Sequence, residues 1–197
     1  MAITTSDSQV FKAKKIIVSC GRWVEELYPE ISQITTTEEQ AVVYFDLKNI
    51  EQYSVGKFPA FFHFKKNIGF YSAPNWDGTG LKIGDHYWRE GEIPKEKKVE
   101  IITNMAKEYF GNDYIGVNHV ERCWYTNTKT EDFIIDWADP GTDRILICSC
   151  CSGHSFKLSP MVGKIASDIV VKGKTIDLVE KEGHCFKIPY HQGVNLK

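Results

Sequence analysis

Residues 144–160 read RILICSCCSGHSFKLSP and join an apolar run to the start of a helix. Residues 144–148 are typical of a buried strand, and Ser159 is a candidate N-cap for a helix whose first residue is Pro160. Apolar residues then recur at helical spacing, at Val162, Ile165, Ala166 and Ile169. A strand, a loop and a helix in this order direct the loop amides and the helix N-terminus at one point. The stretch therefore predicts a binding site for a cofactor or an anion.

The composition of the chain is that of an ordinary globular protein. Its 197 residues are 42% hydrophobic and 25% charged, which allows one sizeable core or two small ones. The net charge of -2 provides no chain-wide basic field, which argues against nucleic-acid binding. No apolar run reaches the ~18 residues of a membrane-spanning helix, and residues 1–14 lack the apolar core of a signal peptide. We therefore expect no membrane association.

The six cysteines are predicted to be thiols, because no signal peptide directs the chain to an oxidising compartment. Cys148, Cys150 and Cys151 are close enough in sequence to be candidate ligands of a metal ion. No second Cys/His pair follows them at zinc-finger distance, however, so no metal is predicted. The alternative is that these cysteines act as small apolar residues at the end of a buried strand.

The N-terminal part carries a fragment of an α/β pattern. Residues 16–19 predict a short, buried, parallel strand that ends at Cys20-Gly21. Residues 24–27 predict one or two helical turns before Pro29.

From Val42 to His86 the pattern changes to β. Apolar segments flanked by turn residues predict an antiparallel sheet with strands at 42–45, 60–64, 69–72 and 81–84, and residues 65–67 resemble a hairpin connection. Residues 94–110 have apolar positions at helical spacing, and we expect this helix to cover one face of the sheet.

Two further strands are predicted at 117–125 and 133–136, and the tail at 173–197 is expected to be an extended segment. The predicted fold class is α+β: a remnant of an α/β domain joined to a mainly antiparallel sheet with a covering helix.

Several separated motifs resemble one known family. They are residues 123–128 (CWYTNT), 132–136 (DFIID), 152–157 (SGHSFK), 162–165 (VGKI) and 81–84 (LKIG), with Tyr71 and His86. In order and spacing they resemble the C-terminal half of the monomeric sarcosine oxidase family, within the D-amino-acid-oxidase-like flavoproteins. That family includes N-methyltryptophan oxidase and the peroxisomal sarcosine and pipecolate oxidases. The resemblance runs from about Lys14 to Gly173.

The resemblance implies a division of the chain into three segments. Residues 1–40 correspond to part of the FAD-binding domain, residues 41–118 to the substrate domain, and residues 119–197 to a return to the FAD-binding domain with its flavin-facing loop. The GxGxxG loop that receives the pyrophosphate in such proteins has no counterpart here. The expected partner is therefore a missing N-terminal FAD-binding half.

The resemblance also implies five cofactor-binding residues. Cys123 matches the cysteine that forms a thioether to the flavin ring, and a buried strand cysteine is its alternative interpretation. Gly153 and His154 would lie near the flavin, although a turn that requires positive φ also explains the glycine. Gly21 and Trp23 match a glycine and a tryptophan that follow a strand near FAD. The implied cofactor is FAD, covalently attached through Cys123.

Catalytic and substrate-binding roles are implied for five more residues. Lys82 matches a lysine near the flavin that activates dioxygen, where a fixed cation would stabilise developing negative charge. Tyr71 and His86 correspond to pocket residues, and a structural histidine is the alternative for His86. Lys157 matches the lysine that binds the substrate carboxylate. Tyr125 would lie at the edge of the substrate pocket, with core packing as its alternative.

The resemblance, together with the missing GxGxxG loop, implies two alternative functions. The first is an FAD-dependent oxidase of N-methyl or cyclic secondary amino acids, which uses dioxygen and releases hydrogen peroxide. The second is a non-catalytic remnant, or half of a split flavoprotein, that acts as a binding or assembly partner. The loop departs from the family at Cys150, Cys151 and Ser155, where glycines and an aromatic residue are usual. The expected location is intracellular, cytoplasmic or peroxisomal, although Asn195-Leu196-Lys197 is not a Ser-Lys-Leu type of address.

Overall fold

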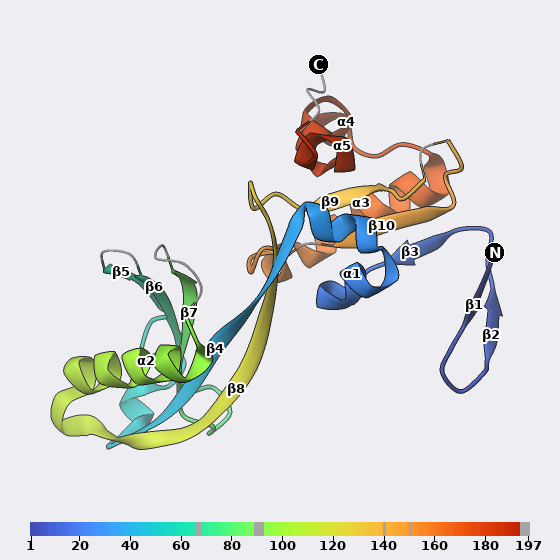
Figure 1. Cartoon of the computed structure of the whole chain (residues 1–197). Coiled ribbons are helices and arrows are strands. Elements are labelled where there is room, and N and C mark those ends of the chain that lie inside the picture. The colour runs from blue at the N-terminus through green and yellow to red at the C-terminus, as the bar shows by residue number, and fades with distance from the viewer. Residues whose placement is uncertain (66–67, 89–92, 140, 150, 194–197) are drawn as a thin grey trace. The chain divides into compact units, whose positions relative to one another are not determined.

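The computed structural model describes residues 1–65, 68–88, 93–139, 141–149 and 151–193. The chain divides into two compact units (Figure 1). Unit 1 contains residues 1–38 and 125–197, and unit 2 contains residues 39–124. Strands β4 (Thr35–Leu47) and β8 (Tyr114–Thr128) each contribute residues to both units.

Unit 2 is built on a five-stranded sheet in the order β5-β6-β7-β4-β8. Strand β5 spans Phe61–Lys65, β6 spans Ile68–Ala73 and β7 spans Leu81–Trp88. The pairs β5–β6, β6–β7 and β7–β4 are antiparallel, as the alternating pattern predicts. The expected hairpin at 65–67 lies largely outside the described residues.

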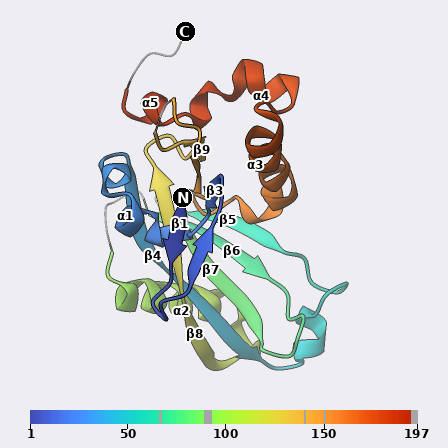
Figure 2. The same cartoon turned by 90° about the vertical axis from the view of Figure 1, so that its right-hand side faces the viewer.

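Helix α2 (Lys95–Phe110) covers one face of this sheet (Figure 2), which confirms the predicted covering helix. Ile102, Met105 and Ala106 of the helix pack with Val43, Phe45, Phe70 and Ile83 of the strands in one buried core. Burial of such side chains stabilises a fold by about 1.5–3 kcal/mol each. Because side chains alternate along a strand, the residues between these core positions lie on the opposite face.

One buried polar group joins α2 to the sheet. Lys98 is 4% exposed, and its Nζ lies 3.2 Å from Asp85 Oδ2 and donates to the Glu39 carbonyl at 2.7 Å. The other Asp85 oxygen accepts a hydrogen bond from the Ala41 amide at 2.6 Å. Paired and hydrogen-bonded in this way, both charges are compatible with burial.

Unit 1 contains a three-stranded sheet in the order β3-β10-β9. Strand β3 (Ile16–Val18) pairs in parallel with β10 (Ile145–Ser149), which pairs antiparallel with β9 (Ile134–Trp137). The predicted parallel strand is confirmed. Its predicted burial is wrong, because Ile17 is 42% exposed and β3 forms an edge of the described sheet.

The helices of unit 1 correct two predictions. Helix α3 spans Ser159–Lys172, so Ser159 is inside the helix and Leu158 occupies the N-cap position without a side-chain cap. Pro160 is tolerated there because the first amides of a helix have no intrahelical partner. The tail is not extended but forms α4 (Asp177–Glu182), the 3-10 helix η6 (Gly183–Phe186) and α5 (Ile188–His191).

The remaining elements are short. They are the hairpin β1 (Ala2–Thr4) and β2 (Val10–Lys12), helix α1 (Val24–Leu27), and the 3-10 helices η1 (Gly21–Trp23), η2 (Pro29–Gln33), η3 (Ile50–Tyr53), η4 (Gly111–Asp113) and η5 (Phe156–Leu158). Within the described part of the chain, no helix has both the length and the apolar character needed to cross a membrane.

Candidate functional site

The face of the unit 2 sheet opposite α2 carries three of the predicted site residues. Tyr71 is paired with Gly84 across β6 and β7, and Lys82 and His86 lie two residues on either side of Gly84. Side chains spaced by two residues on a strand point to the same face. The strand register therefore brings Tyr71, Lys82 and His86 together, and Cys123 of β8 belongs to the same unit.

Tyr71 is the most constrained of these side chains. Its ring crosses over Gly84, because a Cβ built on that glycine would lie 2.5 Å from the ring carbon Cζ and from the hydroxyl oxygen. The Lys82 ammonium lies 5.6 Å from the centroid of the same ring, within the range of a cation–π contact. Burial, followed by the negative charge of the ionised form of Cys123, raises the pKa of the Tyr71 phenol. The phenol is therefore neutral and a hydrogen-bond donor at neutral pH.

Tyr44 is a further titratable group on this face, and it was not predicted from the sequence. The Tyr44 ring stacks on His119 with centroids 4.2 Å apart, and its hydroxyl donates to Glu121 at 3.2 Å. Burial and the Glu121 carboxylate raise the pKa of Tyr44 to about 12. Tyr44 pairs with Lys82 in the β4–β7 register, so strand alternation could have revealed it once the strands were aligned.

Exposed aromatic side chains lie beside the predicted catalytic residues. Phe62 and Phe64 of β5 are 62% and 60% exposed, and their rings stack with centroids 6.2 Å apart. The Phe62 ring lies 6.1 Å from that of Tyr71 and 5.7 Å from that of His86. An apolar, aromatic surface thus adjoins the three polar residues.

In unit 1, the loop after β10 is organised around Ser152, Gly153 and His154. The Ser152 amide donates to the Thr126 carbonyl at 3.1 Å, and His154 Nδ1 lies 2.9 Å from the Ser152 carbonyl oxygen. Gly153 has φ of +71°, and a Cβ there would lie 2.4 Å from the Tyr125 ring. Positive φ and a close approach to Tyr125 together explain this glycine.

Tyr125 and His154 both contact neighbouring side chains or backbone in unit 1. Tyr125 is 8% exposed, which corresponds to the core-packing alternative for this residue. The His154 ring lies 4.9 Å from that of Phe133.

A cavity of about 460 Å³ lies in unit 1 between the sheet and α3. It is lined by Ile17 and Cys148 of the sheet, by Gly21 of η1, and on the other side by Cys151, Ser155 and Gly163, among others. The volume is in the range of cofactor sites, and most of the lining side chains are small or apolar. A Cβ on Gly21 or Gly163 would meet no atom within 4 Å, so both glycines leave open space. The volume and the lining of this cavity are compatible with part of a cofactor such as a flavin.

The remaining predicted residues of unit 1 are exposed. Trp23 is 51% exposed, and the Arg22 guanidinium lies 4.6 Å from its ring centroid. Lys157 lies in η5 on the surface, next to Phe156, which is 92% exposed. Cys150 lies outside the described residues. Among the residues that the structure describes, no group of three or more His, Cys, Asp or Glu side chains is arranged to hold a metal ion.

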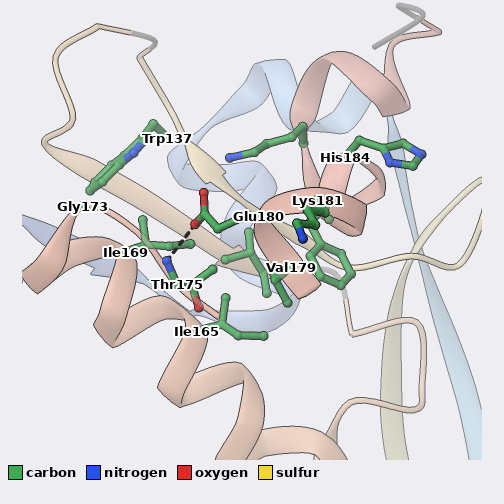
Figure 3. Close-up of a pocket in the computed structure, with 13 residues that line it drawn as sticks. Trp137, Ile165, Ile169, Gly173, Thr175, Val179, Glu180, Lys181 and His184 are labelled. Atoms are coloured by element: carbon green, nitrogen blue, oxygen red, sulfur yellow. Dashed lines mark hydrogen bonds between the residues drawn. The ribbon is translucent and has the colours of Figure 1, made fainter. Parts of the chain in front are cut away.

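A second cavity in unit 1, of about 380 Å³, contains none of the predicted site residues (Figure 3). Apolar side chains of α3, including Ile165 and Ile169, face Val179 and Glu180 of α4 across it. A Glu180 carboxylate oxygen accepts a hydrogen bond from the Thr175 amide at 2.7 Å, which closes one end of the lining. The cavity is lined by residues of α3, α4 and η6, together with Ile135 and Trp137 of β9.

Comparison with known proteins supports the resemblance. Residues 2–169 match the model of the DAO family, described as FAD dependent oxidoreductase. The chain is 32% identical over 184 residues to N-methyl-L-tryptophan oxidase of Escherichia coli O127:H6, and 32% identical over 186 residues to that of Salmonella agona. Each match covers 89% of this chain and 48% of the relative. The chain thus spans about half the length of the curated relatives it matches.

Solved structures show the same fold at lower identity. A thermally stable mutant of fructosyl peptide oxidase superposes with a TM-score of 0.72 at 16% identity, over 94% of this chain and 48% of that chain. NikD, an amino acid oxidase of nikkomycin biosynthesis, gives a TM-score of 0.70 at 14% identity, over 94% of this chain and 50% of that one.

Proposed function

Because the chain belongs to the DAO family of FAD-dependent oxidoreductases, we propose that it is the substrate-facing part of a flavin-dependent oxidase of secondary amines. The observation that carries the proposal is the grouping of Tyr71, Lys82 and His86 on the sheet face opposite α2. Residues 41–118 act as the substrate domain, and residues 1–40 and 119–197 belong to the FAD-binding domain. The substrate is an N-methyl or cyclic amino acid.

FAD binds in unit 1 along the cavity lined by Gly21 and Cys151, with Trp23, Gly153 and His154 nearby. Cys123 forms the covalent link to the flavin. The chemistry supplied by a bound flavin is removal of a hydride equivalent from the carbon next to the amine, followed by reduction of dioxygen to hydrogen peroxide.

The protein side chains bind and orient the reactants. The Lys82 ammonium stabilises negative charge that develops on dioxygen, because it is a fixed cation in a partly buried position. In unit 2, the neutral Tyr71 phenol donates a hydrogen bond to the substrate, and His86 lies beside it. In unit 1, Tyr125 has the role of a substrate-binding residue. The Lys157 ammonium pairs with the substrate carboxylate. Such a pair needs a cation that forms no ion pair with an acidic side chain of the protein.

Hydrogen peroxide release tests this proposal. The chain is produced with excess FAD, alone and together with a separately produced N-terminal half of one of the N-methyl-L-tryptophan oxidase relatives. Sarcosine, pipecolate and N-methyl-L-tryptophan are supplied in turn. We expect peroxide from at least one amine, and much slower release from Lys82→Met. No peroxide from any preparation, with the chain folded by circular dichroism, contradicts the oxidase proposal.

The second candidate function is that of a non-catalytic partner that binds another chain. It is favoured by the edge of β3, which has no strand on its outer side within the described sheet, and by the exposed Ile17 on that strand. An exposed parallel edge strand is a template for pairing. A folded chain that binds no flavin but forms a stable complex with the N-terminal half supports this second function.

A further inference from the structure

We infer that Gly84 is a positioning residue for the proposed reaction: its missing side chain lets the Tyr71 ring cross strand β7 and reach toward β4 and β8. The inference deepens the proposed function, because it concerns the placement of a residue to which that function assigns a role. It is carried by contacts within unit 2.

The backbone of Gly84 does not itself require glycine. Its φ lies outside the left-handed region, unlike that of Gly78 or Gly80 in the preceding loop. Gly84 lies within β7, opposite Tyr71 on β6 and Val42 on β4. Glycine in the interior of a strand is unfavourable by about 0.5–1 kcal/mol relative to alanine. The glycine therefore calls for another explanation, such as the close approach of a neighbouring group.

That neighbouring group is the end of the Tyr71 side chain. The three nearest atoms to a Cβ built on Gly84 are Cζ, Oη and Cε1 of Tyr71, at 2.5, 2.5 and 2.6 Å. Real Cβ atoms do not approach other atoms so closely, so an alanine would displace something. Since the atoms in the way belong to the far end of a side chain, the ring would move and the strands would stay in register.

The direction of the ring gives this contact its functional meaning. Strands β6 and β8 are separated by β7 and β4, so their backbones are ~14 Å apart at the usual strand spacing. Cys123 and Glu121 of β8 and Tyr44 of β4 nevertheless raise the pKa of Tyr71, after the larger effect of burial. A ring that crosses β7 over Gly84 accounts for this proximity, and it brings the phenol toward the proposed flavin-linking cysteine.

The first test is nuclear magnetic resonance of the full chain with tyrosines labelled with ¹³C at Cζ. The Tyr71 resonance is assigned by its absence in Tyr71→Phe. In Gly84→Ala we expect that resonance to shift and its titration to move down toward the ordinary value of 10.0. The matched control is Gly116→Ala on β8, because a Cβ at Gly116 meets no atom within 4 Å. An unchanged Tyr71 resonance and titration in Gly84→Ala overturns the inference.

A double variant keeps the test decisive if Gly84→Ala folds poorly. In Tyr71→Ala the ring is removed, so adding Gly84→Ala should cause no further fall in melting temperature. If Gly84→Ala lowers the melting temperature of Tyr71→Ala as much as it lowers that of the unchanged chain, the glycine serves something other than Tyr71, and the inference is wrong.

In a preparation that releases peroxide, turnover by the variants distinguishes an effect on the position of the Tyr71 ring from an effect on the stability of the chain. We expect Gly84→Ala to lower kcat/KM on the order of 10²-fold, the effect of a displacement of about 1 Å in an active site. In a Tyr71→Ala background the same substitution should have no further effect on kcat/KM, and an additive loss contradicts the inference. If the unchanged chain releases no peroxide, the proposed function fails while the spectroscopic test of Gly84 still stands.

Discussion

The Tyr125 ring packs against the Gly153 backbone so closely that a Cβ on the glycine would lie 2.4 Å from the ring carbon Cε2. The two residues come from different parts of unit 1: Tyr125 lies near the end of β8, and Gly153 lies in the loop after β10. The contact, together with the hydrogen bond from the Ser152 amide to the Thr126 carbonyl, holds that loop against the strand. Loop conformation and strand packing are therefore coupled.

Substitution of Gly153 by alanine should destabilise unit 1 by more than its backbone angle alone explains. Gly141→Ala is the matched control, because Gly141 has φ of +90° and no atom within 4 Å of a Cβ. We expect the control to cost about 1–2 kcal/mol from the left-handed backbone. Gly153→Ala should cost on the order of 1–3 kcal/mol more from overpacking against Tyr125. Urea denaturation measures both, and equal losses would show that the Tyr125 contact is unimportant.

Removal of the Lys98 ammonium should strongly destabilise unit 2. Lys98→Met removes a buried ammonium 3.2 Å from the buried Asp85 carboxylate, at an expected cost of about 3–5 kcal/mol. Lys97→Met, one residue earlier on the exposed side of α2, should change the free energy of unfolding by less than about 0.5 kcal/mol. Adding Asp85→Asn to Lys98→Met should recover part of the loss. Thermal denaturation that shows similar melting temperatures for Lys98→Met and Lys97→Met contradicts the role of this pair.

The free energy of unfolding should fall at alkaline pH in a way that depends on Tyr71. The folded chain raises the pKa of Tyr71 above the ordinary value of 10.0, so the phenolate is disfavoured in the folded state. The stability associated with this group is fully present below pH 10 and is lost as pH rises through the folded pKa. Tyr71→Phe should therefore show a shallower loss of stability above pH 10 in urea denaturation. Identical alkaline slopes for the two proteins would rule out this contribution.

Lys157 should affect substrate binding without affecting the fold. Its side chain is exposed and has no hydrogen bond or ion pair within the described structure. We expect Lys157→Met to leave the melting temperature unchanged and to raise KM for amino acid substrates about 10- to 100-fold, the effect of losing a charge-assisted hydrogen bond. An amide derivative of the same substrate, which lacks the carboxylate, serves as the control. An equal rise in KM for the amide argues against a carboxylate contact.

The sequence was sufficient to predict the elements whose periodicity is strong. The antiparallel strands, the covering helix and the parallel strand at residues 16–19 all follow from apolar spacing, and the structure contains each of them. Strand β4 is longer than expected, because Thr35 to Gln40 carry few apolar side chains and their pairing depends on partners distant in sequence. The tail was predicted as extended because Gly173, Gly183 and Pro189 divide it into helices too short to show a helical pattern.

The candidate site could be predicted only in part for a similar reason. The family resemblance identified Tyr71, Lys82 and His86, and the register explains why they share a face. Tyr44 lies outside the motifs, and Gly84 lies in the 81–84 motif with no role implied for it, since the importance of each depends on which residue lies opposite it. Such cross-strand relationships become visible only once the strands are aligned.

The most direct test of the central claim is the absorbance spectrum of the chain produced with excess FAD, recorded before and after acid precipitation. We expect a protein-bound flavin spectrum that remains with the precipitate, and loss of the retained colour in Cys123→Ala. The N-terminal half of a relative is supplied in a parallel preparation. A folded chain that is colourless under both conditions would contradict the claim that this chain forms part of a flavin site.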